Sequence, residues 1–464
     1  MSSHDEFWER SKSPAFKPVR RVRPEDSPGT PVEKAPDPAI PEEIIDQRRY
    51  FSPEFMRLEW ERMWTKVWLL GGRELDIPEP GDYLVTEIGP ESILIVRQKD
   101  GGIRAFYNVC QHRGNRLRAC GLGTTGQGLS FVCAYHHWEY ELDGSYRRIP
   151  DIDTFGQGKP AHGLSEVKVD TWGGFVWYTL NESPQPLLEF LGPIPQHLDP
   201  YNLNKMVQTR DITVEWDCNW KTSVDAFNES YHVQGIHPQL LWYLHDLDIQ
   251  IDCYERHSRY LIPFGTLSPR VRKPPSIPEP IKTIMKAAGI DPADYDEPLA
   301  NVRGDVQKHK RVHGKTQGKD YSKLNDDQLT DDYHYLIFPN LSLNVHADDF
   351  WIFRQRPHAH DPDRMYYDIM TFELVPDGAE WPERAEHRRW KHGEKGIGTV
   401  LDQDAANLPG VQAGMHSKGF KGLWIGRQEL RIRHFHKVLD DYIYGRGAES
   451  GATAGSLPAD EDNP

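Results

Sequence analysis

The 464-residue chain has few cysteines, no excess of positive charge and no long apolar run. Its five cysteines are an odd and sparse set for this length, which argues against a disulfide framework and favours a reducing cytoplasm. The net charge of −15 argues against a general nucleic-acid binder. No apolar run of about 18 residues occurs, so we expect no membrane span, and the acidic start predicts no secretory signal. These absences favour a soluble cytoplasmic enzyme.

The length predicts two or three domains, and the texture of the sequence changes along it. Residues 14–42 are crowded with proline and charge and predict an extended arm, while the last residues, 447–464, predict a disordered tail. Between about 67 and 180, short β-rich runs alternate with turn residues such as Asp100-Gly-Gly. We therefore expect a compact antiparallel β domain with its Cys and His residues in loops.

The later part of the chain mixes helices and strands. A helix is expected over about 219–235, strands over 335–374, and further helices from Thr399 and over 435–444. The polar and basic passage 265–325 resembles a structureless loop, which at this length is typical of a lid, an interface or disorder. Its basic part favours an anionic substrate or an acidic partner, or else is a solvated loop.

Two short motifs in the β region form the most specific feature of the sequence. They are Cys110-x-His112 and Cys133-x-x-His136. Each loop would bring two donors to one point, and two thiolates with two imidazoles can hold a two-iron cluster of raised potential. The alternative is a Cys2His2 zinc site, which expects a Cys pair and a separate His pair on a helix. Because each half here contains one Cys and one His, the iron–sulfur interpretation is favoured.

A second set of metal-binding residue types follows in the expected helix over 219–235. Asp225, Glu229 and His232 would share one helix face, and His237 follows five residues after His232. A glycine and a proline beside His237 would break the helix and allow the second histidine to turn back. Two histidines and a carboxylate form the ferrous site that activates oxygen. A lone His pair of this spacing is nevertheless weak evidence by itself.

The combination of C-x-H, C-x-x-H, N-W-K and E-x-Y-H-x4-H resembles the large subunit of the Rieske non-haem iron, aromatic-ring-hydroxylating oxygenases. The resemblance covers roughly residues 45–445. It implies an α+β fold: an antiparallel β Rieske domain inserted in a helix-grip (START-like) catalytic domain with an antiparallel sheet and helices. The domains would be an arm over 1–44, a helix of the catalytic domain over 45–66, the Rieske domain over 67–182, the catalytic domain over 183–446, and the tail.

The resemblance also implies residue roles. The ligands of a [2Fe-2S] cluster would be Cys110, His112, Cys133 and His136. Those of a mononuclear Fe(II) would be His232, His237 and a carboxylate that lies eight residues before a glutamine, namely Asp404 before Gln412, with Asp402 as the fallback. Glu229 would bridge electrons between subunits, and Asp225 would lie behind the ligands. Phe227, Leu240, Trp242 and Tyr243 are candidates for the substrate pocket.

Three departures from the family pattern are visible. The loop between the two cluster motifs is longer than usual, His137 replaces a glycine, and Ala226 replaces a common asparagine. His137, beside a ligand candidate, is expected to pack or to support the ligands from behind rather than to be a fifth ligand, and Cys120 is left out of the cluster as a core or surface thiol.

The resemblance implies a terminal oxygenase that uses O2 and electrons from NAD(P)H, delivered by a ferredoxin or reductase. Its partners would be a small organic substrate and copies of itself in a homotrimer, with or without a small β subunit, but no nucleic acid or membrane. Cis-dihydroxylation of an aromatic ring is favoured, and monooxygenation or demethylation of a non-aromatic or N- or O-methyl substrate is the alternative. A non-enzymatic iron–sulfur or zinc protein is the alternative from another class.

Overall fold

The computed structural model describes residues 34–445, which divide into two compact units. The larger unit contains the described residues up to Met56, Gln196–Arg356, and the described residues from Pro362 onward. The smaller unit contains Arg57–Pro195 and Pro357–Asp361. The expected arm before residue 34 and the expected tail lie outside the described residues, and residues 34–44 form no helix or strand.

The smaller unit is built from two antiparallel sheets. The seven-stranded sheet has the order β1-β10-β9-β4-β3-β2-β5, and the three-stranded sheet the order β6-β7-β8. Their bounds are β1 Leu69–Arg73, β2 Asp82–Ile88, β3 Glu91–Arg97, β4 Ile103–Tyr107, β5 Gly121–Thr124, β6 Ser130–Val132, β7 Glu139–Glu141, β8 Tyr146–Arg148, β9 Glu166–Trp172 and β10 Phe175–Thr179. The expected turn at Asp100-Gly-Gly joins β3 to β4, with Gly101 at φ +84°. The antiparallel β architecture is thus confirmed.

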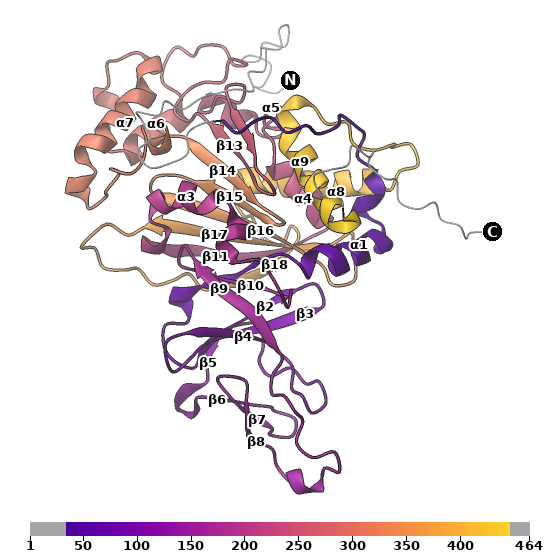
Figure 1. The fold of residues 1–464 in the computed structure, drawn as a ribbon. Coiled ribbons are helices and arrows are strands. Elements are labelled where there is room, and N and C mark those ends of the chain that lie inside the picture. The colour runs from indigo at the N-terminus through magenta and orange to yellow at the C-terminus, as the bar shows by residue number, and fades with distance from the viewer. Residues whose placement is uncertain (1–33, 446–464) are drawn as a thin grey trace. The chain divides into compact units, whose positions relative to one another are not determined.

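The larger unit is built around an eight-stranded sheet of order β12-β13-β14-β15-β16-β17-β11-β18 (Figure 1). Its strands are β11 Met206–Trp216, β12 Gln250–Cys253, β13 Ser258–Ile262, β14 Asp332–Ile337, β15 Leu341–Val345, β16 Asp349–Pro357, β17 Met365–Leu374 and β18 Arg388–Lys391. The strands expected over 335–374 are therefore present as β14–β17. Every residue of β12, β13 and β14 is buried, because this part of the sheet is covered on both faces.

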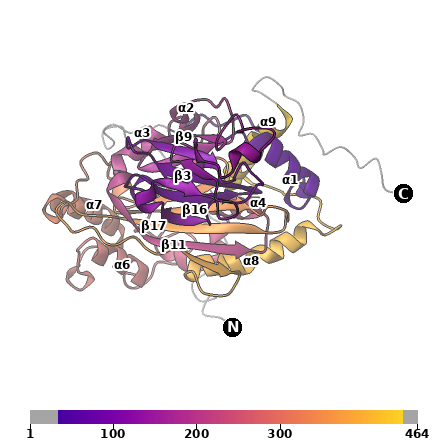
Figure 2. The ribbon, with the colours of Figure 1, turned by 90° about the horizontal axis from the view of Figure 1, so that it is seen from below.

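The helices of the larger unit are α4 Trp220–Phe227, α5 Val233–Ile236, α6 Glu279–Ala287, α7 Val302–His313, α8 Thr399–Met415 and α9 Leu430–Tyr444. Three further helices lie near the unit boundaries in the chain: α1 Pro53–Glu59, α2 Leu187–Leu191 and α3 Ile194–Leu198. In two perpendicular views α6 and α7 lie at one end of the larger unit, and α8 and α9 at the other (Figures 1 and 2). Within the described range, no helix is both long and apolar enough to cross a membrane.

The helix expected over 219–235 is wrong as one continuous element. It ends at Phe227, where Asn228 leaves the helical conformation at ψ 9°, and a short second helix, α5, begins only at Val233. Asp225, Glu229 and His232 therefore do not share one face of an unbroken helix. The side chain of Asn219 accepts a hydrogen bond from the N–H of Lys221 and so starts α4 where the sequence indicated.

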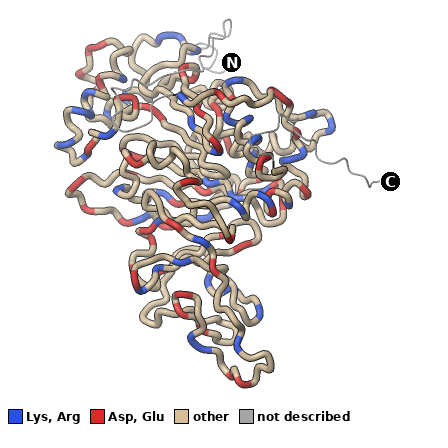
Figure 3. Tube along the Cα trace, viewed as in Figure 1, with Lys and Arg blue, Asp and Glu red and all other residues tan. Residues whose placement is uncertain are grey.

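The passage 265–325 is not structureless, and that expectation is also wrong. It folds into α6 and α7, which bury their own small core of Ile281, Met285, Ala288, Val302 and Val306. The apolar residues recur at helical spacing inside a polar and basic sequence, which concealed them. Acidic and basic residues are interspersed along this region (Figure 3).

Candidate metal centres

The two loops that carry the Cys and His pairs share one backbone pattern. In the first loop, the Cys110 N–H donates to the Asn115 carbonyl at 2.8 Å and the Gly114 N–H to the Cys110 carbonyl at 3.0 Å. The second loop repeats both bonds at the same distances over residues 133–138. The fourth residue after each cysteine has a positive φ, +76° at Gly114 and +59° at His137. Each loop thus presents its cysteine and histidine from the same kind of turn.

The two cysteines of these loops lie in the core of the smaller unit, and the two histidines are partly exposed beside them. Both cysteines are buried and belong to its main apolar cluster. The His112 and His136 rings lie 4.5 Å apart between centroids, and Trp138 stacks on His112 at 4.8 Å. The Nδ1 atom of His112 is buried without a hydrogen-bond partner among the described residues. An orphaned imidazole nitrogen beside two free thiols fits a metal cluster, and nothing else in the loops satisfies it.

Hydrogen-bond donors surround the two sulfur atoms. The Tyr140 hydroxyl lies 3.2 Å from Cys110 Sγ and accepts from the Gln111 N–H at 2.9 Å, which leaves the hydroxyl proton for the sulfur. Asn115 Nδ2 lies 3.7 Å from Cys133 Sγ. Burial alone would raise the pKa of the Cys133 thiol, but backbone N–H groups of its loop outweigh this and lower it. Such donors stabilise ligating thiolates and tune the potential of an iron–sulfur cluster.

His137 is not a packing residue, which was one of the two roles expected from the sequence. Its side chain is exposed, and its φ of +59° lies in the left-handed region that favours glycine. This explains why a family pattern would have glycine here. Cys120 is exposed and lies outside both loops.

The second site brings together the residues expected to bind a mononuclear metal. One ligand atom each from His232, His237 and Asp404 lie within 4.8 Å of one another. His237 Nε2 is 2.8 Å and His232 Nε2 is 4.0 Å from Asp404 Oδ1. His237 and Asp404 are buried, whereas His232 is partly exposed. A two-His, one-carboxylate face of this kind suits Fe(II) and leaves other positions of the metal open.

Two acceptors fix the tautomer of the two histidines. Glu229 Oε1 lies 2.5 Å from His232 Nδ1, and Gln403 Oε1 lies 2.8 Å from His237 Nδ1. Both oxygens can only accept, so each Nδ1 carries a proton, and each Nε2 is the nitrogen left for a metal ion to bind. Burial would lower the pKa of His232, but the charge of Glu229 outweighs it and raises that pKa. The donor set is therefore prepared for a metal ion.

The chain reaches this geometry because the helical path is interrupted between α4 and α5 and ends after α5, and because α8 packs against α4. The α5 helix ends at Ile236, and His237 takes a non-helical conformation (φ −123°, ψ 51°) before Pro238. The second histidine is thus turned back by the helix end, as its neighbours indicated. The fallback ligand Asp402 is engaged elsewhere, because its Oδ1 accepts from the Ile397 N–H at 2.8 Å.

Asp404 was chosen as a ligand because it lies eight residues before Gln412, and the contacts of Gln412 give this spacing a structural reason. Its Oε1 accepts from the Asn219 N–H and from the Thr222 hydroxyl, each at 2.9 Å, and so fastens α8 to the first turn of α4. Asp404 lies two turns earlier on the same helix. Gln412 thereby sets where α8 delivers its carboxylate. Neither Gln412 nor Gln403 was assigned a role from the sequence, although both flank the frame around Asp404.

Asp225 is bound to residues from distant parts of the larger unit. Its Oδ2 accepts from the Tyr50 hydroxyl at 2.5 Å and lies 3.2 Å from His436 Nε2. Its Oδ1 is buried without a partner among the residues that the structure describes. Asp225 therefore borders the site but orients neither histidine ligand candidate by the contacts described.

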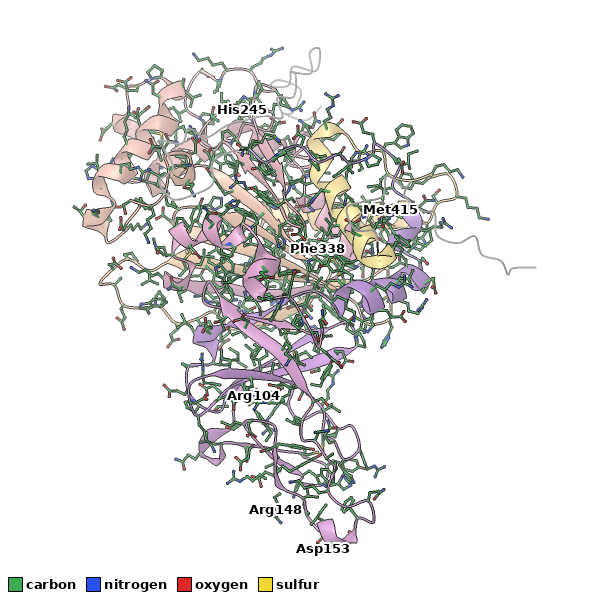
Figure 4. The ribbon with its side chains drawn as sticks, viewed as in Figure 1. Arg104, Arg148, Asp153, His245, Phe338 and Met415 are labelled. Atoms are coloured by element: carbon green, nitrogen blue, oxygen red, sulfur yellow. The ribbon has the colours of Figure 1, made fainter. Side chains whose placement is uncertain are left out.

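A cavity of about 280 Å³ opens beside His232 and Asp404. Four carboxylates line it, from Asp225, Glu229, Asp404 and Glu429, and no Lys or Arg does. Burial raises the pKa of Glu429, and the charges of Glu229 and Asp225 add to that rise. Apolar side chains complete the wall, including Met415 at the end of α8 (Figure 4). The cavity thus combines acidic and apolar side chains with the polar side chains of Thr222 and Asn407.

The four pocket candidates lie apart from the lining of this cavity. The Phe227 ring stacks on Tyr367 at 5.6 Å, and Tyr243 meets Phe264 edge-on at 5.4 Å. Leu240 packs against the apolar cluster that includes β12 and β13, and Trp242 is half-buried. Their contact with substrate stays a prediction.

Both parts of the chain match known protein families. Residues 203–445 match the family of ring-hydroxylating alpha subunits (catalytic domain), and residues 67–168 match the Rieske [2Fe-2S] domain. A glycine betaine monooxygenase oxygenase subunit from Chromohalobacter salexigens is 35% identical over 199 residues, 42% of this chain and 44% of the relative. The alpha subunit of benzene 1,2-dioxygenase from Pseudomonas putida is 32% identical over 195 residues, 40% of this chain and 43% of the relative. The match thus spans less than half the length of these relatives.

Solved structures share the fold at low sequence identity. The quaternary ammonium Rieske monooxygenase CntA in complex with L-carnitine has a TM-score of 0.61 at 19% identity, covering 89% of this chain and 99% of that one. Naphthalene 1,2-dioxygenase from Rhodococcus sp. bound to indole has a TM-score of 0.61 at 20% identity, covering 86% and 94%. The mixed α+β fold expected from the sequence is confirmed.

Proposed function

We propose, from the premise that this chain belongs to the ring-hydroxylating oxygenase alpha-subunit family and carries a Rieske domain, that it is the terminal component of a multicomponent oxygenase. The observation that carries the proposal is the approach of His232, His237 and Asp404 within 4.8 Å. When bound, a [2Fe-2S] cluster supplies one-electron transfer and an Fe(II) ion supplies O2 activation. Electrons would come from NAD(P)H through a ferredoxin or reductase.

The residues of the chain would prepare the two metal sites. Cys110, Cys133, His112 and His136 would hold the cluster. Glu229 and Gln403 hold the protons on the outer nitrogens of His232 and His237 and keep the inner nitrogens available. Glu229, which is mostly buried, would also bridge to a cluster histidine of a neighbouring copy in a homotrimer. A small β subunit is compatible with this assembly.

The acidic cavity favours one substrate type within this class. Four carboxylates beside the metal site would attract a cationic group, and an N-methylated ammonium compound is a small organic substrate with that property. The relatives include both monooxygenases that act on such compounds by name and aromatic dioxygenases. We therefore place monooxygenation at an N-methyl group before cis-dihydroxylation, the reverse of the order that the sequence alone favoured.

The basic passage gives little support to steering of an anionic partner. Lys310 pairs with Asp348 at 2.8 Å, Arg311 with Asp326 at 2.9 Å, and Arg303 with Asp331 at 2.9 Å. These three cations are paired within the fold, which weakens the case that they steer an anionic substrate or partner.

The test is an oxygen-uptake assay on protein loaded anaerobically with iron and sulfide, with a surrogate ferredoxin and reductase. Substrate-dependent uptake and the visible colour of a Rieske cluster are expected, with N-methylated ammonium compounds and aromatic hydrocarbons as the two substrate sets. A colourless zinc protein would support a structural metal site instead. A coloured protein that takes up no oxygen with either set, and binds no iron at His232 and His237, would support a non-enzymatic electron carrier.

A further inference from the structure

Two of the four carboxylates that line the cavity have no part in the candidate metal site. Glu229 accepts from the backbone N–H and the ring of His232 with its two oxygens, and Asp404 is a ligand candidate. The other two carboxylates belong to Asp225, in the last turn of α4, and to Glu429, which caps the start of α9. These two are therefore available to a ligand in the cavity.

Asp225 is held through one oxygen only. Its Oδ2 accepts from the Tyr50 hydroxyl at 2.5 Å and lies 3.2 Å from His436 Nε2. Arg49 donates to His436 Nδ1 at 3.1 Å, and because a guanidinium can only donate, the proton of His436 lies on Nε2, toward Asp225. Burial lowers the pKa of His436, so the ring is neutral and does not compensate the charge of the carboxylate.

The other oxygen of Asp225 is an unpaired acceptor on a residue that lines the cavity. Asp225 is 8% exposed, and its Oδ1 is buried without a partner in the part of the chain that the structure describes. Its one ionisable partner within residues 34–445 is His436. The basic residue of α4, Lys221, has its ammonium over the rings of Tyr50 and Trp220. Since buried acceptors normally have a partner, a donor from a ligand is expected at Oδ1.

Glu429 adds a second carboxylate with an oxygen to spare. Its Oε2 accepts from the Gly426 N–H at 2.7 Å, and no residue of the described range bonds to its Oε1. Burial raises the pKa of Glu429, the charges of Glu229 and Asp225 raise it further, and Arg433 opposes them more weakly. The negative charges of the cavity thus repel one another, and a bound cation would relieve that repulsion.

We propose that Asp225 and Glu429 bind the protonated nitrogen of the substrate, with Asp225 Oδ1 accepting an N–H from it. This rests on the proposed function and narrows its substrate class to methylated amines that keep an N–H. Charge-assisted N–H···O bonds are strong, so such an amine satisfies the unpaired oxygen and balances the charge together. A quaternary ammonium brings the charge without an N–H and would leave Oδ1 unpaired. The N-methyl group then lies in the cavity that His232 and Asp404 border.

The test measures binding to the iron-loaded protein without oxygen or reductant, so turnover is not required. Two amines that are protonated at neutral pH are compared with their quaternary partners: trimethylamine with tetramethylammonium, and dimethylaminoethanol with choline. Isoamyl alcohol, in which carbon replaces the nitrogen of dimethylaminoethanol, is the uncharged control. By isothermal titration calorimetry, each amine should bind about 10-fold or more tightly than its quaternary partner, and the alcohol most weakly.

The variant Asp225→Asn separates hydrogen bonding from ligand size. Tyr50 and His436 both donate to Oδ2, so the amide should turn its oxygen toward them and place its NH2 where Oδ1 was. Affinity for the amines should fall about 10- to 100-fold, and their preference over the quaternary partners should vanish. A preference due to size alone would survive this substitution.

Two further variants separate local charge from the net charge of the protein. Glu429→Gln keeps the oxygen that caps Gly426 and should weaken amines and quaternary compounds alike. Asp441→Asn is the matched control, because Asp441 pairs with Lys437 on α9 at 2.5 Å and does not line the cavity. This control should bind every probe as the wild type does.

Three results would overturn the assignment: quaternary partners that bind the wild type as tightly as the amines, an amine preference that persists in Asp225→Asn, or equal losses in Asp441→Asn. The wild-type comparison needs no variant, so it decides the proposal even if Asp225→Asn does not fold. Mononuclear iron content is measured on the same samples. An absence of that iron would defeat the oxygenase proposal, whereas the preference for amines would still decide this one.

Discussion

The two candidate metal centres are built in opposite ways. The cluster loops each place a cysteine and a histidine within four residues of chain, and two backbone hydrogen bonds define each loop. The mononuclear site joins His237 to a carboxylate 167 residues away and depends on the packing of α8 against α4. Local chain geometry therefore defines the first centre, whereas long-range packing defines the second. The two should respond differently to substitution.

Removal of a metal ligand should produce the largest difference between the two centres in metal content. His237→Ala deletes one of three donors and should abolish both mononuclear iron binding and oxygenase turnover. The visible absorption of the cluster should remain, because its four proposed ligands lie in the other unit. Iron content and the visible spectrum of the same sample check both expectations.

The reciprocal variant is Cys133→Ala. It should bleach the visible bands and abolish reduction of the protein by the electron donor, while the other site still takes up Fe(II). If either variant removed both metals, the independence of the two centres would be refuted.

Loosening α8 should harm only the mononuclear site. Gln412→Leu leaves the Asn219 N–H and the Thr222 hydroxyl buried without their acceptor, which should cost about 2–4 kcal/mol. Asp404 should then be displaced, with loss of iron but not of cluster colour. Thr222→Val removes only one donor and should cost less. Thermal unfolding and iron retention after gel filtration measure the effect, and equal losses at both centres would contradict it.

The acceptor behind His232 should tune iron affinity without removing a ligand. Glu229→Ala frees Nδ1 and should weaken Fe(II) binding about 10- to 100-fold. Glu229→Gln keeps an oxygen acceptor at the same place and should lose less. Anaerobic titration with Fe(II) distinguishes the two variants, and identical affinities would show that the hydrogen bond does not orient the histidine.

The smallest expected effects are changes in stability caused by substitutions at matching positions of the two cluster loops. Gly114→Ala should destabilise and His137→Gly should stabilise the protein, each by about 1 kcal/mol, because both positions are left-handed. No atom lies within 4 Å of a Cβ at Gly114, so its cost is purely conformational. Ala134→Gly is the control, since no positive φ occurs there and added glycine should slightly destabilise. Unfolding temperatures with the cluster in place test the signs.

Sequence patterns predicted most elements whose signal is local. The strands β14–β17 follow from short β-rich runs, and α4 begins where the expected helix over 219–235 begins. The failures occurred where a local signal was incomplete. Asn228 ended α4 although the surrounding residues suit a helix, and the apolar residues of α6 and α7 were hidden among lysines and arginines. The exposed, left-handed conformation of His137 was not predicted because it cannot be read from the identity of the residue.

The sequence by itself determined the cysteine and histidine pairs and the spacing of His232 and His237, because short segments admit few geometries. Only the tertiary structure decided that Gln403 orients His237 and that Gln412 positions Asp404. Those facts depend on which distant side chains meet after packing. Burial is what gives each of these contacts its energetic weight.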